Sequence, residues 1–318
     1  MKILFVIFHL FFLITKLDAS SLKSEQQSDL QNQMENIWQE TKKDYLALDP
    51  DYQEKSEWHR PRFVQQNQKK ELVYILHGFM GTPFEMKIFE QKALLEGYDV
   101  YNDLIYGYGD QAKLVNQTNN GQWMELFNRK LDLLLPHYNK IHFVGFSTGG
   151  LMISHMIFDR QNSIGSKMGE ITLISPFYAP DMFAARFLLN IVSFFINTLP
   201  SDLPYNLIRY PDVVVMINHP ENFMQQIPLP AAKQVMDLAD KFTEKAQTSL
   251  GNFPQMTVYM TPNDRVADYE FTKKYLPKIF TGLNFVTLEG QKAPHHLMVE
   301  SVSEHTILLK NDFLKKRN

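Results

Sequence analysis

The chain has 318 residues, of which 44% are hydrophobic and 21% charged, a composition typical of a globular protein with one large domain or two ordinary ones. The formal net charge of -3 and the lack of a basic stripe argue against a nucleic-acid partner. The sequence contains no cysteine, which excludes disulfides, a cysteine nucleophile and thiolate metal sites.

Residues 1–19 predict an export signal. A single early Lys2 precedes the apolar run "ILFVIFHLFFLI", and Ala19 offers a small residue for cleavage. A membrane anchor is the alternative, but a spanning helix needs about 20 apolar residues, and Lys16 and Asp18 end this run too early. We therefore expect cleavage after Ala19 and a mature protein that works outside the cytoplasm, either periplasmic or secreted.

Residues 20–66 form a polar, glutamine-rich N-terminal extension. Within it Met34, Ile37, Trp38, Tyr45 and Leu48 recur near one face of a helix. This spacing predicts an amphipathic helix that packs on the main body, followed by a loop around "LDPDY".

Beyond the extension, short strand-like runs alternate with helical patterns. "ELVYILHG", "YDVYNDLIYG", "KIHFVGFS", "EITLISPFYA", "PQMTVYM" and "LNFVTLEG" are typical of strands, and "EHTILLKNDFLKK" of a closing helix. Such alternation predicts an α/β fold with a mostly parallel central sheet flanked by helices. We assign residues 67–179 and 253–318 to this core, and residues 180–252, where the alternation stops, to a helical cap or lid.

The cap contains the unusually apolar stretch "DMFAARFLLNIVSFFINTLP", whose polar residues form one narrow helical stripe. Such a helix is either buried on most sides or covers an apolar cleft, and both interpretations stay open. An exposed apolar lid would also allow transient contact with a membrane or lipid interface. If the helix covers a cleft, the side chains expected to line it and to contact a substrate are Phe187, Leu188, Ile191, Phe194 and Phe195.

Ser147 lies at a strand-to-helix corner within the pattern G-x-S-x-G. Gly145 and Gly149, two positions to either side, allow the strand and the helix to approach closely, so that the serine hydroxyl projects from a sharp turn. A tight packing turn is the alternative interpretation. Between a strand pattern and an apolar helix, however, the motif is typical of a catalytic nucleophile.

A nucleophilic serine needs a base and an acid that orients the base. Asp264 lies in the loop after the strand "PQMTVYM". This loop is expected at the edge of the sheet where the parallel strands have their carboxyl ends. Asp268 and Glu270 are rival acids, but both fall in the following helix. We therefore favour Asp264 as the acid.

The base is expected in the loop after the last strand, where His295 and His296 are adjacent. We favour His296, because it directly precedes the apolar run "LMV" that opens the final helix; His295 is then a wall residue. The chain order Ser, Asp, His is one in which catalytic triads occur. No residues show metal-ligand spacing, so neither a metal nor another cofactor is expected.

The oxyanion of an acyl-transfer reaction needs backbone donors near the serine. The strand "ELVYIL" ends in "HGF", so the N–H of Phe79 is one candidate. The N–H of Thr148, directly after Ser147, is the other.

With these motifs in place, the sequence resembles the α/β-hydrolase superfamily, and most of all its capped monoacylglycerol lipase and small carboxylesterase branch. The resemblance rests on "LHGFMGTPFEM", "GFSTGG", "TPNDRV" and "HHLMV", in the family's order, from about Glu71 to Lys316. It implies a triad of Ser147, Asp264 and His296. The sequence departs from the family in having "GYG" at 107–109 where Gly-His-Gly is common, and the resemblance extends neither to the cap nor to the first 66 residues.

The resemblance implies a serine ester hydrolase that cleaves small-molecule or lipid acyl esters through an acyl-enzyme on Ser147. An acyltransferase or thioesterase with the same triad is the alternative, because fold and triad do not separate these activities. A non-catalytic binding protein on the same fold is a third hypothesis. It predicts that a triad member is missing, and none is.

Overall fold

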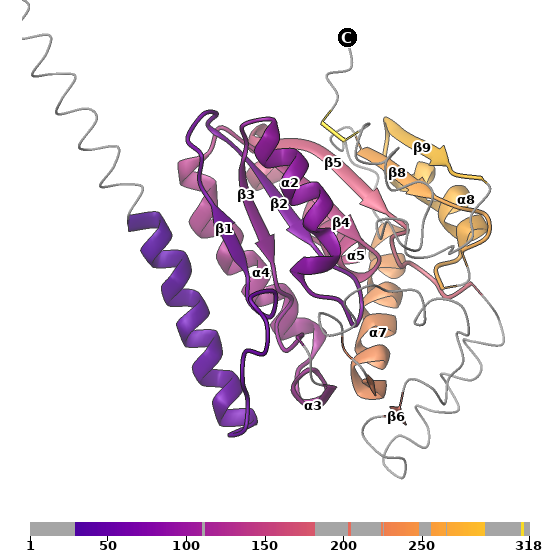
Figure 1. The fold of residues 1–318 in the computed structure, drawn as a ribbon. Coiled ribbons are helices and arrows are strands. Elements are labelled where there is room, and N and C mark those ends of the chain that lie inside the picture. Colours follow the sequence, from indigo (N-terminus) through magenta and orange to yellow (C-terminus); the bar gives the residue numbers. More distant parts are fainter. Residues whose placement is uncertain are drawn as a thin grey trace, which may run out of the picture. The chain divides into compact units, whose positions relative to one another are not determined.

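The computed structural model describes residues 29–109, 112–181, 203–204, 224, 226–247, 256–264, 266–289 and 313–314. The chain divides into two compact units, Met1–Lys43 and Asp44–Asn318. A helix covers residues 29–48 and crosses the boundary between the units (indigo in Figure 1). The predicted N-terminal helix is therefore confirmed, whereas its packing on the main body stays a prediction.

The second unit alternates strands and helices as the sequence predicts. In chain order the elements are β1 (Arg62–Val64), β2 (Glu71–Leu76), η1 (Pro83–Met86), α2 (Lys87–Leu95), β3 (Asp99–Asp103), α3 (Ala112–Val115), α4 (Asn120–Leu134), η2 (Leu135–His137), β4 (Lys140–Phe146), α5 (Thr148–Ile164), η3 (Gly165–Lys167), β5 (Met168–Ile174), β6 (Leu203–Pro204), β7 (Gln226–Ile227), α7 (Leu229–Ala246), β8 (Met256–Met260), α8 (Tyr269–Ile279) and β9 (Leu283–Thr287).

A seven-stranded sheet with the order β1-β3-β2-β4-β5-β8-β9 forms the centre of this unit (Figure 1). Its neighbouring strands are parallel except for β1 and β3, so the predicted mostly parallel α/β sheet is confirmed. From β2 the chain moves to β3 on one side and then returns to β4 on the other. At such a reversal the connecting loops diverge and leave a crevice beyond the carboxyl ends of the strands. The loop at 77–81 and Ser147 both lie at this point.

Helices cover both faces of the sheet, with α2 on one face and α4 and α5 on the other (Figure 1). Side chains of β2 consequently alternate between two packed surfaces. Val73 and Ile75 join an apolar cluster with Phe89 of α2. Tyr74 points to the other side, where its ring centroid lies 5.1 Å from that of Phe127 on α4. Burial on both faces explains why the strands read as nearly continuous apolar runs.

The edge strand β1 was not expected from the sequence, and it falls within residues 20–66, which the sequence analysis assigns to the extension. It pairs antiparallel with β3, with Arg62 opposite Asn102. The end of the extension is thus part of the core sheet. The predicted closing helix over "EHTILLKNDFLKK" lies almost wholly outside the described residues.

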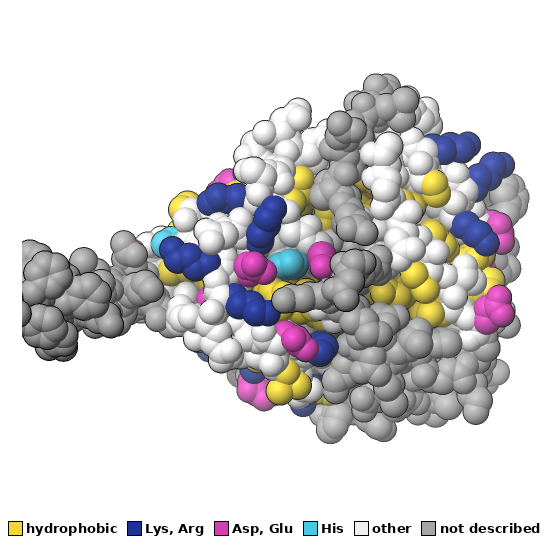
Figure 2. All heavy atoms as spheres, turned by 90° about the horizontal axis from the view of Figure 1, so that it is seen from above, with side chains coloured by type: hydrophobic (Ala, Val, Ile, Leu, Met, Phe, Trp, Pro, Cys, Tyr) yellow, Lys and Arg dark blue, Asp and Glu magenta, His cyan; other side chains and the backbone are white. Residues whose placement is uncertain are grey.

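Figure 2 views the end of the sheet from which β2 and β3 start. Among the described residues on this face, Lys and Arg side chains lie interspersed with Asp and Glu and do not gather by sign. On β4, the Nε2 atom of His142 lies 3.1 Å from a carboxylate oxygen of Glu71. In the part of the chain that the structure describes, no helix is both long enough and apolar enough to span a bilayer.

Candidate active site

Ser147 occupies the corner between β4 and α5 in an unusual backbone conformation, with φ 50° and ψ -114°. Such angles favour glycine over residues that carry a Cβ atom. Backbone hydrogen bonds enforce them: the N–H of Ser147 donates to Ile174 (3.0 Å), and its carbonyl accepts from Leu151 (3.0 Å) and Phe177 (3.2 Å). Strain of this kind costs about 1–3 kcal/mol and persists only where the surroundings impose it.

The two glycines of the G-x-S-x-G motif lie where the strand, the helix and the neighbouring strand meet. A Cβ atom added at Gly145 would lie 2.7 Å from the backbone nitrogen of Gly150. One added at Gly149 would lie 2.5 Å from the carbonyl oxygen of Leu76 and 2.6 Å from that of His77. Only glycine allows these approaches, as the motif predicts.

The loop after β2 lies directly beside Ser147. A Cβ atom added at Gly78 would come within 3.2 Å of the Ser147 Cβ atom. The loop turns back at once: the N–H of Gly81 donates to the carbonyl of Gly78 at 3.1 Å, with Met80 at a φ of 62°. Phe79 is the second residue of this turn, and Thr148 begins α5 on the other side of Ser147. Thr148 thus follows the serine in the chain, and Gly78, the residue before Phe79, lies against the serine side chain. The oxyanion roles of Phe79 and Thr148 remain predictions.

Asp264 is buried in the turn after β8, with 1% of its surface exposed. Its Oδ1 accepts hydrogen bonds from the N–H groups of Val266 (2.9 Å) and Ala267 (3.0 Å), which fix the carboxylate in one orientation. Strand β5 lies between β4 and β8 in the sheet. Asp264 thus follows a strand end on the same edge of the sheet as Ser147.

The rival acids have other environments. Asp268 is the N-cap of α8, and its carboxylate accepts a hydrogen bond of 2.8 Å from the N–H of Phe271. Glu270 is exposed in the first turn of the same helix. Of the three acids only Asp264 is buried and lies in the turn directly after β8, whereas Asp268 and Glu270 belong to the start of α8, which favours Asp264 as the orienting acid.

His77, in the loop beside Ser147, is a buried structural histidine. The N–H of Ile105 donates to its Nε2 at 3.1 Å, so the ring proton is on Nδ1, which donates to the carbonyl of Gly78 at 2.8 Å. Burial lowers the pKa of His77, which keeps the ring neutral. With both ring nitrogens occupied, His77 is not available as a general base.

The "GYG" segment after β3 forms a wall next to this loop. The ring of Tyr108 is fully buried, with its centroid 5.4 Å from that of His77 and 6.2 Å from that of Phe79. The N–H of Gly107 donates to the hydroxyl of Tyr45 at 2.6 Å. Tyr45, from the last turn of the helix at 29–48, thereby fixes a loop at the candidate site.

Several residues assigned from sequence lie outside the described part of the chain. These are the candidate base His296, its neighbour His295 and the acyl-site residues Phe187, Leu188, Ile191, Phe194 and Phe195. Their roles remain predictions. Among the described residues, no group of three or more His, Asp or Glu side chains could hold a metal ion.

Sequence reasoning missed two buried residues near the site. Glu85 accepts a hydrogen bond of 2.8 Å from the N–H of Gly78. Ser175, directly after β5, has a φ of 41°, and its buried hydroxyl has no hydrogen-bond partner within the described part of the chain. Neither carries a sequence signal, because a lone acid or serine occurs in many loops. Only the tertiary structure brings them to Ser147.

The described residues thus form a mostly parallel α/β sheet with a strained serine at the end of its central strand, β4. No protein-family model and no curated protein matches the sequence. Solved structures do match, and they show that the chain has the α/β-hydrolase fold, as the sequence resemblance predicted.

A structure from the study of LipS and LipT, two metagenome-derived lipolytic enzymes, is 15% identical over 80% of this chain and 95% of its own, with a TM-score of 0.64. A soluble variant of the monoglyceride lipase from Saccharomyces cerevisiae is 12% identical over 82% and 96%, with a TM-score of 0.63. The thioesterase domain from the curacin biosynthetic pathway is 12% identical over 78% and 94%, with a TM-score of 0.52.

Proposed function

We propose that the protein is a serine hydrolase of carboxylic esters. The observation that carries this proposal is the conformation of Ser147, a non-glycine residue held at φ 50° by three backbone hydrogen bonds beside a glycine-lined loop. A packing turn would be satisfied by glycine at lower cost. The lipolytic enzymes and monoglyceride lipase among the structural neighbours support an ester substrate.

The proposed reaction begins when the Ser147 hydroxyl oxygen attacks the ester carbonyl carbon while His296 accepts the hydroxyl proton. The carbonyl oxygen becomes an oxyanion that accepts hydrogen bonds from the backbone N–H groups of Phe79 and Thr148. The C–O bond to the alcohol then breaks, and His296 returns its proton to the leaving alkoxide. Water repeats the sequence on the acyl-enzyme and releases the acid. Asp264 orients the imidazole and stabilises its cation.

The test is a series of p-nitrophenyl esters from acetate to palmitate, hydrolysed by the full chain and by Ser147→Ala. A matched control is Ser163→Ala, which removes an exposed hydroxyl near the end of α5 that donates to the Arg160 carbonyl at 2.9 Å. We expect the first variant to lose at least about 1,000-fold in kcat and the control to retain full activity. Full hydrolysis by Ser147→Ala would refute the mechanism.

The choice of base is tested in the same assay. His296→Ala is expected to be as inactive as Ser147→Ala, because residues that act as one unit are not additive. His295→Ala is expected to alter KM more than kcat, as a wall residue would. The opposite pattern would transfer the role of the base to His295.

Thioester hydrolysis is the second candidate, because a thioesterase domain is among the structural neighbours. Acyl transfer to an alcohol would use the same acyl-enzyme. Competition between p-nitrophenyl and thiophenyl esters of one acid, with and without an added alcohol, separates the three activities by their products.

We further propose that the protein is exported and that the cap residues line the acyl site. N-terminal sequencing of protein recovered outside the cytoplasm should begin at Ser20. If the cap contacts lipid interfaces, hydrolysis of long-chain esters should rise sharply above their critical micelle concentration. A smooth saturation curve through that concentration would contradict interfacial contact.

A further inference from the structure

Glu85 is a buried carboxylate enclosed by the turn beside Ser147. Only 3% of its surface is exposed, and its Oε2 accepts a hydrogen bond of 2.8 Å from the N–H of Gly78. A Cβ atom at Gly81 would collide with this same carboxylate oxygen. The carboxylate therefore lies against both ends of the Gly78–Gly81 turn.

This turn sets the direction of the Phe79 N–H. Gly78 is adjacent to the Ser147 side chain, and the hydrogen bond from Gly81 to Gly78 closes the turn around Phe79 and Met80. Met80 has a φ of 62°, a left-handed conformation that a non-glycine residue adopts only under constraint. By accepting a hydrogen bond from the N–H of Gly78, Glu85 fixes the His77–Gly78 peptide, which directly precedes the Gly78–Phe79 peptide that carries the Phe79 N–H.

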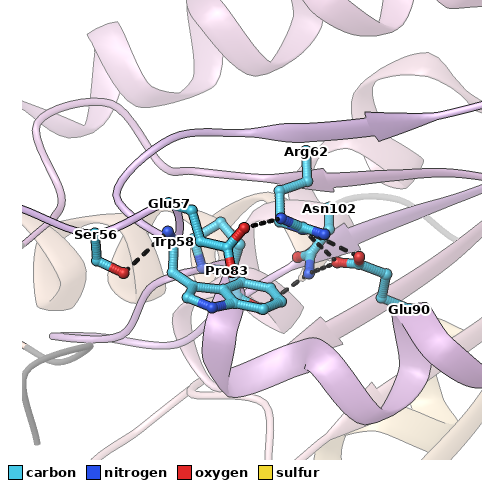
Figure 3. Close-up of polar contacts among 7 residues, drawn as sticks. All are labelled: Ser56, Glu57, Trp58, Arg62, Pro83, Glu90 and Asn102. Atoms are coloured by element: carbon cyan, nitrogen blue, oxygen red, sulfur yellow. Dashed lines mark hydrogen bonds and ion pairs between the residues drawn. The ribbon is translucent and has the colours of Figure 1, made fainter. Parts of the chain in front are cut away.

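A second set of contacts holds the short helix η1, which carries Glu85 (Figure 3). The amide of Asn102 donates to the carbonyl of Pro83 at 2.9 Å and to Glu90 at 2.8 Å. Arg62 donates to both carboxylate oxygens of Glu90, at 3.1 and 3.3 Å. Asn102 and Glu90 are both buried, whereas the Arg62 side chain keeps 28% of its surface exposed, so the charge-assisted bonds from Arg62 are shielded from solvent at their Glu90 end.

Arg62 belongs to the edge strand β1 and is itself held in place. Its guanidinium carbon lies 4.3 Å above the ring of Trp58, and its Nη1 donates to Glu57 at 3.2 Å. The Trp58 ring also packs edge-on against Phe84 of η1, with centroids 5.4 Å apart. The end of the N-terminal extension is thus connected, through two routes, to the helix that positions Glu85.

We propose that Glu85 is a positioning residue for ester hydrolysis, acting through Gly78 to aim the Phe79 N–H at the oxyanion. This inference deepens the proposed function and rests on it. Glu85 does not touch the substrate. It contributes a hydrogen-bond acceptor, and the contacts made by Asn102 and β1 hold the helix η1 that carries this acceptor in place.

The experiment compares Glu85→Gln, which retains an acceptor oxygen, with Glu85→Leu, which retains the approximate shape without one. Glu96→Gln is the matched control, because Glu96 is the exposed C-cap of α2 and pairs with Lys92. A fluorophosphonate probe measures the reactivity of Ser147 without a known substrate. Hydrogen exchange of the peptide that spans residues 77–86 measures the rigidity of the turn.

We expect Glu85→Leu to be labelled about 10- to 100-fold more slowly, since losing an oxyanion donor outright costs 100- to 1,000-fold. Its kcat should fall by a similar factor while KM stays within about threefold, and its turn should exchange faster. Glu85→Gln should recover to within about threefold of the wild type in labelling and should exchange normally. If Glu85 only supported the fold, replacing it would lower the free energy of unfolding but would not lower kcat while leaving KM nearly unchanged.

Two outcomes would overturn the inference: wild-type labelling and exchange in Glu85→Leu, or equal loss in the Gln and Leu variants. The second would mean that the charge, and not the acceptor, matters. If the wild type is not labelled at all, the proposed function fails instead. The exchange comparison then still decides whether Glu85 holds the turn.

Discussion

Gly149→Ala tests whether the nucleophile corner depends on close backbone approach. The new Cβ atom would lie 2.5 Å from the carbonyl oxygen of Leu76 and 2.6 Å from that of His77. Both are backbone atoms of the central sheet and its loop, so no side chain can move aside. Helix α5 would have to retreat by roughly 0.9 Å, the difference between 2.5 Å and the 3.4 Å at which ordinary contact begins.

Overpacking of this kind costs about 1–3 kcal/mol of stability. Because Ser147 directly precedes α5, the retreat also moves the hydroxyl, and a misplacement of about 1 Å can cost 100-fold in rate. We therefore expect Gly149→Ala to unfold at lower urea and to lose at least tenfold in fluorophosphonate labelling of Ser147.

Gly165→Ala is the matched control. Gly165 has a φ of -54°, and a Cβ atom there meets nothing within 4 Å. The substitution should stabilise the protein by about 0.4–1 kcal/mol, because alanine has less conformational freedom in the unfolded chain. Urea unfolding and labelling are measured on both variants. If Gly149→Ala matches Gly165→Ala in both, the close approach does not constrain the site.

Three further predictions follow from the buried groups. Ser147→Gly should be about 1 kcal/mol more stable than Ser147→Ala in urea unfolding, because glycine relieves the positive φ. Lys130→Met should cost about 3–5 kcal/mol, because the Lys130 ammonium lies 2.6 Å from buried Asp103 and its loss leaves that charge uncompensated. Burial lowers the pKa of His155 from 6.5 to about 4, so the folded state holds it neutral. The neutral His155 therefore contributes at most about 3 kcal/mol to the free energy of unfolding above pH 6.5, and this contribution is lost as the pH falls towards 4. Urea unfolding measured across this pH range tests the prediction.

Each of these three predictions would be contradicted by a different result. A Ser147→Gly variant less stable than Ser147→Ala would mean that the corner is unstrained. Adding Asp103→Leu to Lys130→Met should recover part of the lost stability, because it removes the uncompensated charge. If the double variant recovers no stability, the loss does not come from the unpaired Asp103 carboxylate. His155→Gln should show a flatter decline of stability between pH 6.5 and 4 than the wild type. An equal decline would exclude His155 as its source.

The sequence predicted the central sheet because its strands are buried on both faces. "ELVYIL" and "KIHFVGF" are continuous apolar runs for that reason, and the corner at Ser147 stands out between such a run and a helix. Strand β1 is only three residues long and has no periodicity of its own. It is a strand because β3 offers an unpaired edge, which is a property of the sheet and not of "RFV".

The sequence indicates candidate site residues only where a short local motif marks them. Ser147, Phe79 and Asp264 follow recognisable strand ends. Glu85 was missed because an acid in the first turn of a helix is ordinary, being favoured by the helix dipole. Only burial and the Gly78 hydrogen bond distinguish it.

The contact between Tyr45 and the "GYG" segment determines where a functional fragment of this protein can begin. The motifs of the hydrolase resemblance start at Glu71, which invites a cut just before that strand. Such a cut would remove the hydroxyl that accepts the Gly107 N–H, together with the tyrosine ring that lies 5.4 Å from that of Tyr106. It would also remove Arg62. The shortest fragment that preserves the walls of the site therefore begins inside the helix at 29–48, some way upstream of any recognisable hydrolase sequence.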